Sequence, residues 1–200
     1  MTRKYESTDV RQKQILVATK KIIIKSGAEN LTIKRIAREV GISETAIYRH
    51  FKKKNEILSF LIKNIGEIMT QELNEIDREA NVSIVDAIKV VIRNHLSSIE
   101  QKRGVTFQFI AEIISLGDKK LNHKVSIIVD NYIETVKSLL AEGVKTGEIR
   151  DDIDLDAAAT VLFGLIQGLT NIWALKDYKF DPMEKYESLW SIYREAIIKR

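Results

Sequence analysis

Apolar residues recur every three or four positions along most of the chain, which is the spacing of α-helices that bury one face. The clearest case is a short segment whose apolar positions follow the order i, i+3, i+4, i+7: Ile33, Ile36, Ala37 and Val40. Few stretches alternate between apolar and polar residues, and Pro182 is the only proline that could interrupt a helix. The pattern therefore predicts an all-α fold of about nine helices.

Polar caps and glycines divide the N-terminal part of the chain into three helices and the start of a fourth. The second helix is predicted to begin after Thr32 and the third after Ser43, because both hydroxyls can cap a helix. Gly41 suits the positive φ of a sharp turn between these two helices, which together form a helix-turn-helix. A long amphipathic helix is expected to follow from Lys54 to about residue 80.

Further breaks near residues 81–83, 103–104 and 117–118 divide the rest of the chain. Pro182 stands at a natural first position of the last helix. The helices predicted in this C-terminal body cover residues 84–102, 105–116, 121–144, 157–175 and a final segment from residue 182.

Residues 157–175 form a run of 19 residues without a charged side chain, which is long enough to cross a membrane. Polar residues and two glycines fall on one face of this helix, however, and make that face flat and lightly polar. Such a face suits packing against a second copy of the chain, as does the aromatic stripe of the last helix. We therefore expect no membrane contact and a homodimer whose interface contains Thr160, Gly164, Gln167, Gly168, Asn171, Tyr186, Trp190 and Tyr193.

Composition removes several classes of function. The absence of cysteine excludes disulfides, cysteine-ligated zinc and a thiol nucleophile, and it suits a reducing cytoplasm. The N-terminal residues lack the apolar core of a secretion signal. His95 and His123 have no evident shared site with a second ligand, so we expect no metal and no cofactor. No nucleophile–base order, phosphate loop or carboxylate pair indicates an enzyme.

The net charge of +4 hides an uneven distribution. Residues 1–55 contain 14 Lys and Arg against 5 Asp and Glu, whereas the remaining residues contain 18 against 23. A basic N-terminal quarter joined to an acidic body indicates that a polyanion binds at one end only, although a solvated basic helix face would give the same count.

Residues 32–58 follow the pattern T-x-x-x-I-A-x-x-x-G-I-S-x-x-A-I-Y-R-H-F-x-x-K-x-x-I-L, which resembles the TetR family of transcriptional regulators. The resemblance is strong over residues 12–61 and architectural beyond them. It departs little from the pattern, but Glu44 is an acidic residue in the recognition helix. The resemblance implies a helix-turn-helix DNA-binding domain at residues 8–55, with its recognition motif at 32–51, and a helical effector-binding and dimerisation domain at 56–200.

The same resemblance implies a role for each residue of the motif. Thr45, Ala46 and Arg49 are candidates for contacts with base edges, since alanine can meet a thymine methyl group and arginine a guanine. Tyr48, His50 and Lys54 match phosphate-contacting positions. The alternatives are core packing for Tyr48, a buried hydrogen bond for His50 and a phosphate contact for Arg49. The full set of predicted DNA-binding residues is Thr32, Lys34, Ser43, Thr45, Ala46, Tyr48, Arg49, His50 and Lys54.

In a TetR-like body the middle helices surround a ligand cavity, which suggests a pocket for an unidentified small-molecule effector. The candidate lining residues, for which simple core packing is the alternative, are Ile92, His95, Phe107, Phe109 and Ile113.

The expected function is a cytoplasmic, homodimeric repressor that binds double-stranded DNA at a near-palindromic operator. A small, largely apolar effector would tilt the long helix from Lys54 and release the DNA. The alternative is a TetR-like adaptor of the nucleoid-occlusion type, which binds DNA at sites scattered over the chromosome. An enzyme would need a pocket with convergent polar groups.

Overall fold

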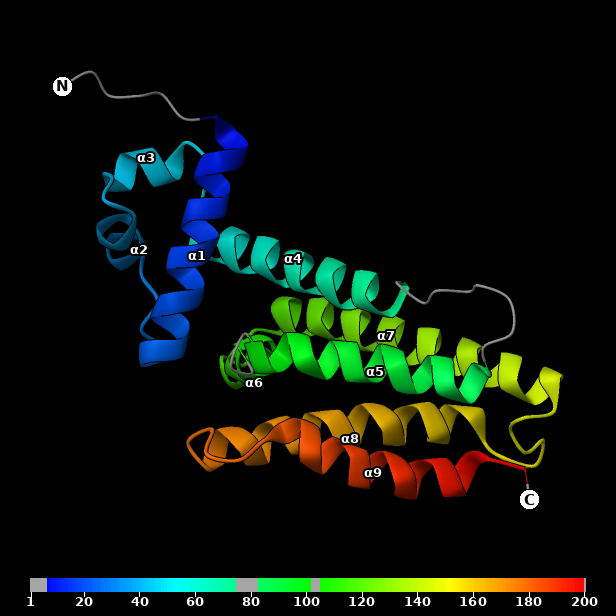
Figure 1. The fold of residues 1–200 in the computed structure, drawn as a ribbon. Helices are drawn as coiled ribbons and strands as arrows, with labels where there is room; N and C mark the ends of the chain where they lie inside the picture. Colours follow the sequence, from blue (N-terminus) through cyan, green and yellow to red (C-terminus); the bar gives the residue numbers. More distant parts are fainter. Residues whose placement is uncertain (1–6, 75–82, 102–104, 200) are drawn as a thin grey trace. The chain divides into compact units, whose positions relative to one another are not determined.

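The computed structural model describes residues 7–74, 83–101 and 105–199, and these ranges contain nine α-helices (Figure 1). The all-α prediction is confirmed. The helices are α1 (Thr8–Ser26), α2 (Ile33–Val40), α3 (Glu44–Tyr48), α4 (Lys54–Asn74), α5 (Ile84–Gln101), α6 (Val105–Ser115), α7 (Lys119–Thr146), α8 (Leu155–Leu175) and α9 (Pro182–Ile197).

The predicted helix boundaries differ from the observed ones by a few residues. α3 ends at Tyr48, and Arg49 and His50 belong to the turn that follows it. α7 and α8 each begin two residues earlier than predicted; the carboxylates of Asp118 and Asp154 accept hydrogen bonds from the first backbone N–H groups there. The expected end of α4 near residue 80 lies outside the described residues.

The chain divides into two compact units. Unit 1 consists of residues 1–65 and 108–125, and unit 2 consists of residues 66–107 and 126–200. The predicted DNA-binding domain ends at residue 55, whereas unit 1 also contains residues 56–65 and 108–125. Three helices, α4, α6 and α7, contribute residues to both units.

The core of unit 1 is built mainly from isoleucine and leucine. Residues from α1, α2 and α3 are fully buried, and so are residues of α4 and α6. The members with an exposed fraction of 1% or less include Ile15, Ile36, Ile47, Ile57, Leu58, Leu61, Phe109 and Ile113. Because α6 supplies Phe109 and Ile113, the three N-terminal helices do not form this core alone.

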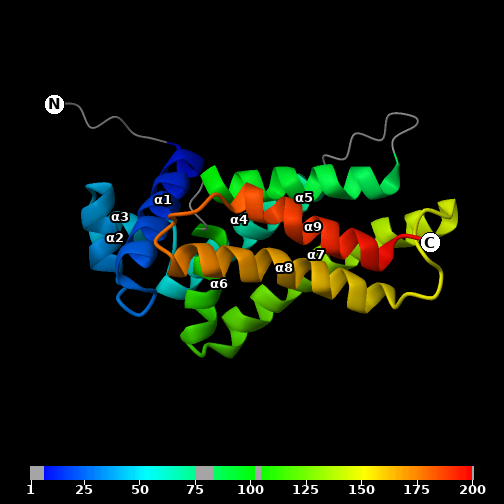
Figure 2. The same cartoon turned by 60° about the horizontal axis from the view of Figure 1, so that its bottom comes forward.

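In unit 2, α9 packs against both α5 and α8 (Figures 1 and 2). The Tyr186 hydroxyl donates to the Lys89 carbonyl of α5 at 3.0 Å, and the Tyr193 hydroxyl donates to the Ala158 carbonyl of α8 at 3.0 Å. Burial raises the pKa of both tyrosines, so the hydroxyls stay protonated donors. Trp190 lies between them on the same face and is 4% exposed.

This packing bears on one part of the predicted dimer interface, the aromatic residues of α9. Tyr186, Trp190 and Tyr193 are each at least 96% buried within the protomer, so they hold α9 to its own unit and offer little surface to a second copy. A stripe of aromatic residues on a helix has the same sequence pattern whether its neighbour belongs to the same chain or to another. Only the tertiary structure distinguishes the two cases.

α8 is the one helix among the described residues that is long and apolar enough to cross a membrane, by length and composition. A core helix of a soluble protein passes the same test. One face of α8 is buried, with Ala159 at 0%, Leu162 at 2% and Ile166 at 2% exposed, while the opposite face is open.

A carboxylate from the turn after α7 caps the start of α5. Glu148 accepts hydrogen bonds from the Ser83 hydroxyl at 2.5 Å and from the backbone N–H groups of Ile84 at 3.2 Å and Val85 at 3.4 Å. Thr146 donates to the same carboxylate at 3.1 Å. Partial burial raises the pKa of Glu148, but these hydrogen bonds outweigh it, and the pKa lies below its ordinary value.

Glu148→Gln should therefore destabilise the protein at pH 7 by about 1 kcal/mol, the usual worth of a helix cap. A carboxylate whose pKa is lowered on folding stabilises the protein above its unfolded-state pKa, here 4.5, and that stabilisation is lost as the pH falls through the lower folded-state value. Urea unfolding from pH 7 to pH 3 should show the difference between wild type and variant shrinking below pH 4.5. Glu142→Gln, at an exposed position of α7, is the control; a constant difference at all pH values would contradict the cap.

Candidate nucleic-acid interface

A sharp turn at Gly41 orients α2 and α3. Gly41 has φ 78° and ψ 33°, in the left-handed region, and the Ile42 N–H donates back to the Ala37 carbonyl at 2.9 Å. Ile36 and Ile47, one on each helix, are both 0% exposed. The turn and the two buried isoleucines leave the opposite side of α3 facing solvent.

Side-chain caps begin both helices of the motif. The Thr32 hydroxyl accepts from the Arg35 N–H at 3.2 Å, and the Ser43 hydroxyl accepts from the Ala46 N–H at 3.2 Å. Each hydroxyl therefore still has its own hydrogen to donate. The other N–H groups of the first turn of α2 add a partial positive charge beside Thr32, which favours an anion there.

The side chains of α3 and of the turn after it are mostly open to solvent. Glu44, Thr45 and Arg49 are exposed, and Tyr48 is 50% exposed, which is incompatible with a core-packing role. Ala46 is half-buried. The exposed set contains an aromatic hydroxyl, a guanidinium and a threonine hydroxyl, which are the groups that hydrogen-bond to phosphates and base edges.

His50 is half-buried, and its Nδ1 atom is buried without a hydrogen-bond partner in the described structure. The ring therefore does not make the buried hydrogen bond that the sequence left open as an alternative on this side. Because Nδ1 is buried, Nε2 is the ring atom left to contact DNA.

The basic surface around α3 includes residues that the sequence analysis did not select. Of the lysines that it did select, Lys34 is exposed, and Lys54, in the first turn of α4, is half-buried. Lys52 and Lys53, in the connection between α3 and α4, are exposed as well. The run of three lysines at 52–54 was the signal that could have identified them.

Not every cation of the motif is available to a ligand. Arg35 is engaged within unit 1: its guanidinium donates to the Asn30 carbonyl at 2.9 Å and to the Ser26 hydroxyl at 2.8 Å. Lys21 of α1 forms an ion pair with Glu39 of α2. These contacts tie α1 to the helix-turn-helix, and the guanidinium of Arg35 is occupied by them.

The residues predicted to line an effector pocket are buried where the structure describes them, but they fall in different units. Ile92 and His95 belong to unit 2, and Phe109 and Ile113 to unit 1; each is 1% exposed or less. The side chain of Phe107 is not among those that the structure describes. His95 packs against Tyr132, with ring centroids 5.5 Å apart. The pocket stays a prediction. No cluster of metal-ligating side chains occurs among the described residues.

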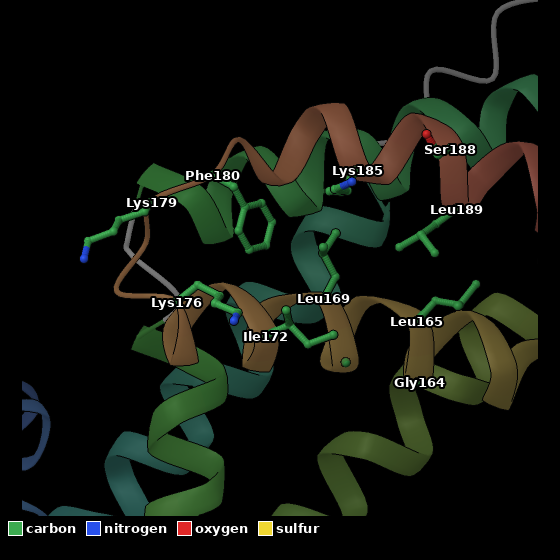
Figure 3. A pocket seen from close by; sticks show the side chains of 11 residues that line it. Gly164, Leu165, Leu169, Ile172, Lys176, Lys179, Phe180, Lys185, Ser188 and Leu189 are labelled. Atoms are coloured by element: carbon green, nitrogen blue, oxygen red, sulfur yellow. The ribbon is translucent and has the colours of Figure 1, made fainter.

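An apolar groove of about 710 Å³ runs between α8 and α9 in unit 2 (Figure 3). Leu165, Leu169 and Ile172 of α8 and Leu189 of α9 face it, while Lys179 points away at one end. Its lining also contains Gly164, Gly168, Lys176, Phe180, Lys185 and Ser188. The groove thus includes two of the predicted dimer residues, Gly164 and Gly168.

The two helices that form this groove also carry large apolar side chains that are exposed at the surface. Val161 and Ile172 are each 53% exposed, Ile192 is 71% exposed and Leu175 is 82% exposed. The sequence analysis chose the polar and glycine positions of α8 and missed these apolar ones. Thr160, Gly164 and Asn171 are exposed and Gln167 and Gly168 half-buried, so all five lie where a partner could reach them.

A capped helix-turn-helix with an exposed third helix beside a run of lysines defines a protein of the DNA-binding class. Comparison with known proteins agrees. A family model described as "Bacterial regulatory proteins, tetR family" matches residues 15–59, and a model described as "YsiA-like protein, C-terminal region" matches residues 60–196. The chain belongs to the TetR family of transcriptional regulators. It is a DNA-binding regulator and not an enzyme. Members of the family act as dimers and bind small-molecule effectors.

Relatives cover most of the chain at low identity. A fatty acid metabolism regulator protein of Bacillus subtilis (strain 168) is 26% identical over 84% of this chain and 86% of its own length. The nucleoid occlusion factor SlmA of Marinomonas sp. (strain MWYL1) is 24% identical over 94% of this chain and 95% of its own. Among solved structures, the transcriptional regulator FadR of Bacillus subtilis in complex with stearoyl-CoA aligns with a TM-score of 0.78 and 24% identity, over 90% of this chain and 96% of that one; this alignment shows a shared fold.

Arg49→Ala should relax the sequence preference of DNA binding at one base position. If the exposed guanidinium donates two hydrogen bonds to a guanine, the loss is about 1–3 kcal/mol on the preferred sequence and much less on the sequence altered at that base. Sequence selection from a random DNA library with wild type and variant measures this. Lys53→Ala, at a neighbouring exposed cation, is the control and should weaken all sequences equally. The same uniform loss for Arg49→Ala would make Arg49 a phosphate contact.

Proposed function

We propose that this regulator is a homodimeric repressor that binds a near-palindromic operator and is released by a long-chain acyl thioester. The exposed surface of α3 and the lysine run at 52–54 carry the DNA-binding part of the proposal, since Ile36 and Ile47 are buried and the side chains of α3 beside Ile47 face solvent. The effector class is supported by the relatives: one regulates fatty acid metabolism, and one structural neighbour contains stearoyl-CoA. The site of action would be the cytoplasm, where operator DNA and acyl thioesters meet.

The open face of α8 and α9 supports the dimer. It combines the groove with exposed apolar residues of both helices, including Ile172, Leu175 and Ile192. A contiguous apolar surface of this kind is costly to leave in water and is typical of an interface between subunits. Gly168 has no atom within 4 Å of the position that a Cβ would take, so the space above it is free for a side chain of the partner.

Two recognition motifs related by a twofold axis would enter successive major grooves, about 34 Å apart along the DNA. Each motif alone makes too few base contacts for a specific site, and the pair explains the expected near-palindrome. An effector that changes the separation of the motifs lowers the DNA affinity, and DNA then lowers the effector affinity by the same factor.

A second candidate function is that of a DNA-binding adaptor of the nucleoid-occlusion type. The alignment with a nucleoid occlusion factor extends over 94% of this chain, ten percentage points more than the alignment with the fatty acid regulator. Binding sites scattered around the chromosome would favour the adaptor, whereas a few sites beside promoters of fatty acid genes would favour the repressor.

Stearoyl-CoA should release the protein from its operator. The operator is obtained by selection from fragmented genomic DNA, and the complex is followed by fluorescence anisotropy of a labelled fragment. We expect a 5- to 150-fold loss of DNA affinity at saturating ligand, the usual range of allosteric coupling. Free coenzyme A and a non-ionic detergent at the same concentration are the controls. Unchanged operator affinity with demonstrated stearoyl-CoA binding would reject the effector role, and loss with detergent alone would reject its specificity.

Gly168→Arg should convert the dimer to a monomer. The added side chain has room within the protomer but places a charge on the apolar face of α8 that would otherwise be buried between subunits. Sedimentation equilibrium at micromolar concentration measures the change, and operator affinity should fall with it. Ser138→Arg, at an exposed position of α7, is the matched control. A fully dimeric Gly168→Arg protein would place the interface on another surface.

A further inference from the structure

The segment from Gln108 to Val125, here called the α6–α7 corner, belongs to the same compact unit as the recognition motif. It consists of the C-terminal part of α6, the turn at Gly117 and Asp118, and the first turns of α7. Phe109, Ile113 and Leu121 of the corner are each 2% exposed or less. Apolar burial fixes the corner within unit 1, but two polar contacts determine which backbone segments it holds.

The first contact joins Glu112 of α6 to the connection between α1 and α2. The carboxylate oxygen Oε2 of Glu112 accepts a hydrogen bond from the backbone N–H of Ala28 at 2.8 Å. Ala28 is 0% exposed, so this N–H has no access to water. The same oxygen lies 3.4 Å from the position that a Cβ would take on Gly27, whose φ is +82°. A buried N–H without this acceptor would cost the full desolvation penalty of the group.

The second contact joins Asp118 to the start of α4. One carboxylate oxygen of Asp118 accepts from the backbone N–H groups of Lys120 at 2.9 Å and Leu121 at 3.1 Å, and so caps α7. The other oxygen accepts from the side-chain amide of Asn55, in the first turn of α4, at 2.7 Å. One side chain thus connects the N-terminus of α7 with the N-terminus of α4.

These two contacts bracket the recognition motif along the chain. Ala28 stands four residues before Thr32, and Asn55 stands four residues after Phe51. A segment held at both ends loses conformational freedom that it would have if it were held at one end. Glu112 lies in α6 and Asp118 caps α7, and both helices have residues in unit 2 as well.

We propose that Glu112 and Asp118 are positioning residues for DNA recognition, which hold the two ends of the recognition motif in the orientation that binds the operator. Neither residue needs to touch DNA. The motif is then attached to helices of unit 2 through α6 and α7 as well as through α4.

The competing explanation is that the two carboxylates only stabilise the fold. It predicts that their removal lowers the melting temperature and leaves the operator affinity of the folded protein unchanged. A positioning role predicts that fewer of the folded molecules hold the motif in the orientation that binds the operator. The apparent operator affinity then falls in proportion to that fraction. The two explanations therefore differ in a quantity that can be measured below the melting temperature.

The test compares Glu112→Ala, Glu112→Gln and Ser115→Ala in the full-length, ligand-free protein. Ser115 is the matched control, because it is an exposed residue of the same corner whose hydroxyl donates to the Glu112 carbonyl of its own helix. Operator affinity is measured at 25 °C on the genomically selected fragment. We expect a threefold to tenfold loss for Glu112→Ala, the size of one hydrogen bond, recovery for Glu112→Gln, whose amide oxygen can still accept, and no change for Ser115→Ala.

Amide hydrogen exchange gives a second measurement that needs no DNA. The Ala28 amide should exchange faster in Glu112→Ala than in the wild type, and at the wild-type rate in Ser115→Ala. Unchanged exchange at Ala28, or unchanged operator affinity together with a lowered melting temperature, would overturn the proposal. Because the inference rests on operator binding, wild type is measured first: absence of binding by the wild type would reject the proposed operator and not the Ala28 contact.

Asn55 adjoins the lysine run and could touch DNA itself, so it is tested by a double-mutant cycle with Asp118. If Asn55 acts through Asp118, Asn55→Ala lowers operator affinity threefold to tenfold in the wild type and has no further effect in the Asp118→Ala protein. An equal loss in both backgrounds would make Asn55 a direct DNA contact and would remove Asp118 from the proposal.

Discussion

The exposed surface of α3 depends on the burial of two isoleucines on either side of one glycine turn. Ile36 on α2 and Ile47 on α3 are both completely buried, and the left-handed conformation of Gly41 lets the two helices meet at that point. Once these side chains point inward, the 100° step of the helix turns Thr45, Tyr48 and Arg49 outward. The chemistry of the surface is therefore a consequence of the packing behind it.

The core behind the motif extends further along the chain than the motif does. α6 supplies Phe109 and Ile113, and the α6–α7 corner to which they belong also supplies the carboxylates of Glu112 and Asp118, which accept hydrogen bonds from Ala28 and Asn55. An apolar core and a few well-placed acceptors together determine one orientation of a short helix pair, which five- and eight-residue helices could not maintain alone. The DNA-binding unit is thus built from two stretches of chain that are far apart in sequence.

The apolar residues of α8 and α9 lie on two sides that differ in burial. The aromatic side of α9 is buried inside the protomer, where the hydroxyls of Tyr186 and Tyr193 donate to backbone carbonyls of α5 and α8. The aliphatic side of α8 and α9 stays open and carries the groove. Tyrosine needs a partner for its hydroxyl when it is buried, which a neighbouring helix of the same chain supplies here, whereas leucine and isoleucine have no such requirement and suit a face that a second subunit covers.

By itself, the sequence determined the helical fold, the helix-turn-helix and which residues of α3 face outward, because local periodicity, caps such as Thr32 and Ser43 and the glycine at 41 act over only a few residues. It also identified α8 as a helix with an unusual face. Only the tertiary structure decided that the aromatic stripe of α9 faces inward, that Arg35 is occupied by Asn30 and Ser26, and that Glu112 satisfies an N–H group 84 residues away. Each of these depends on which surfaces meet after folding, and the pattern of residues along one helix does not identify the element that packs against it.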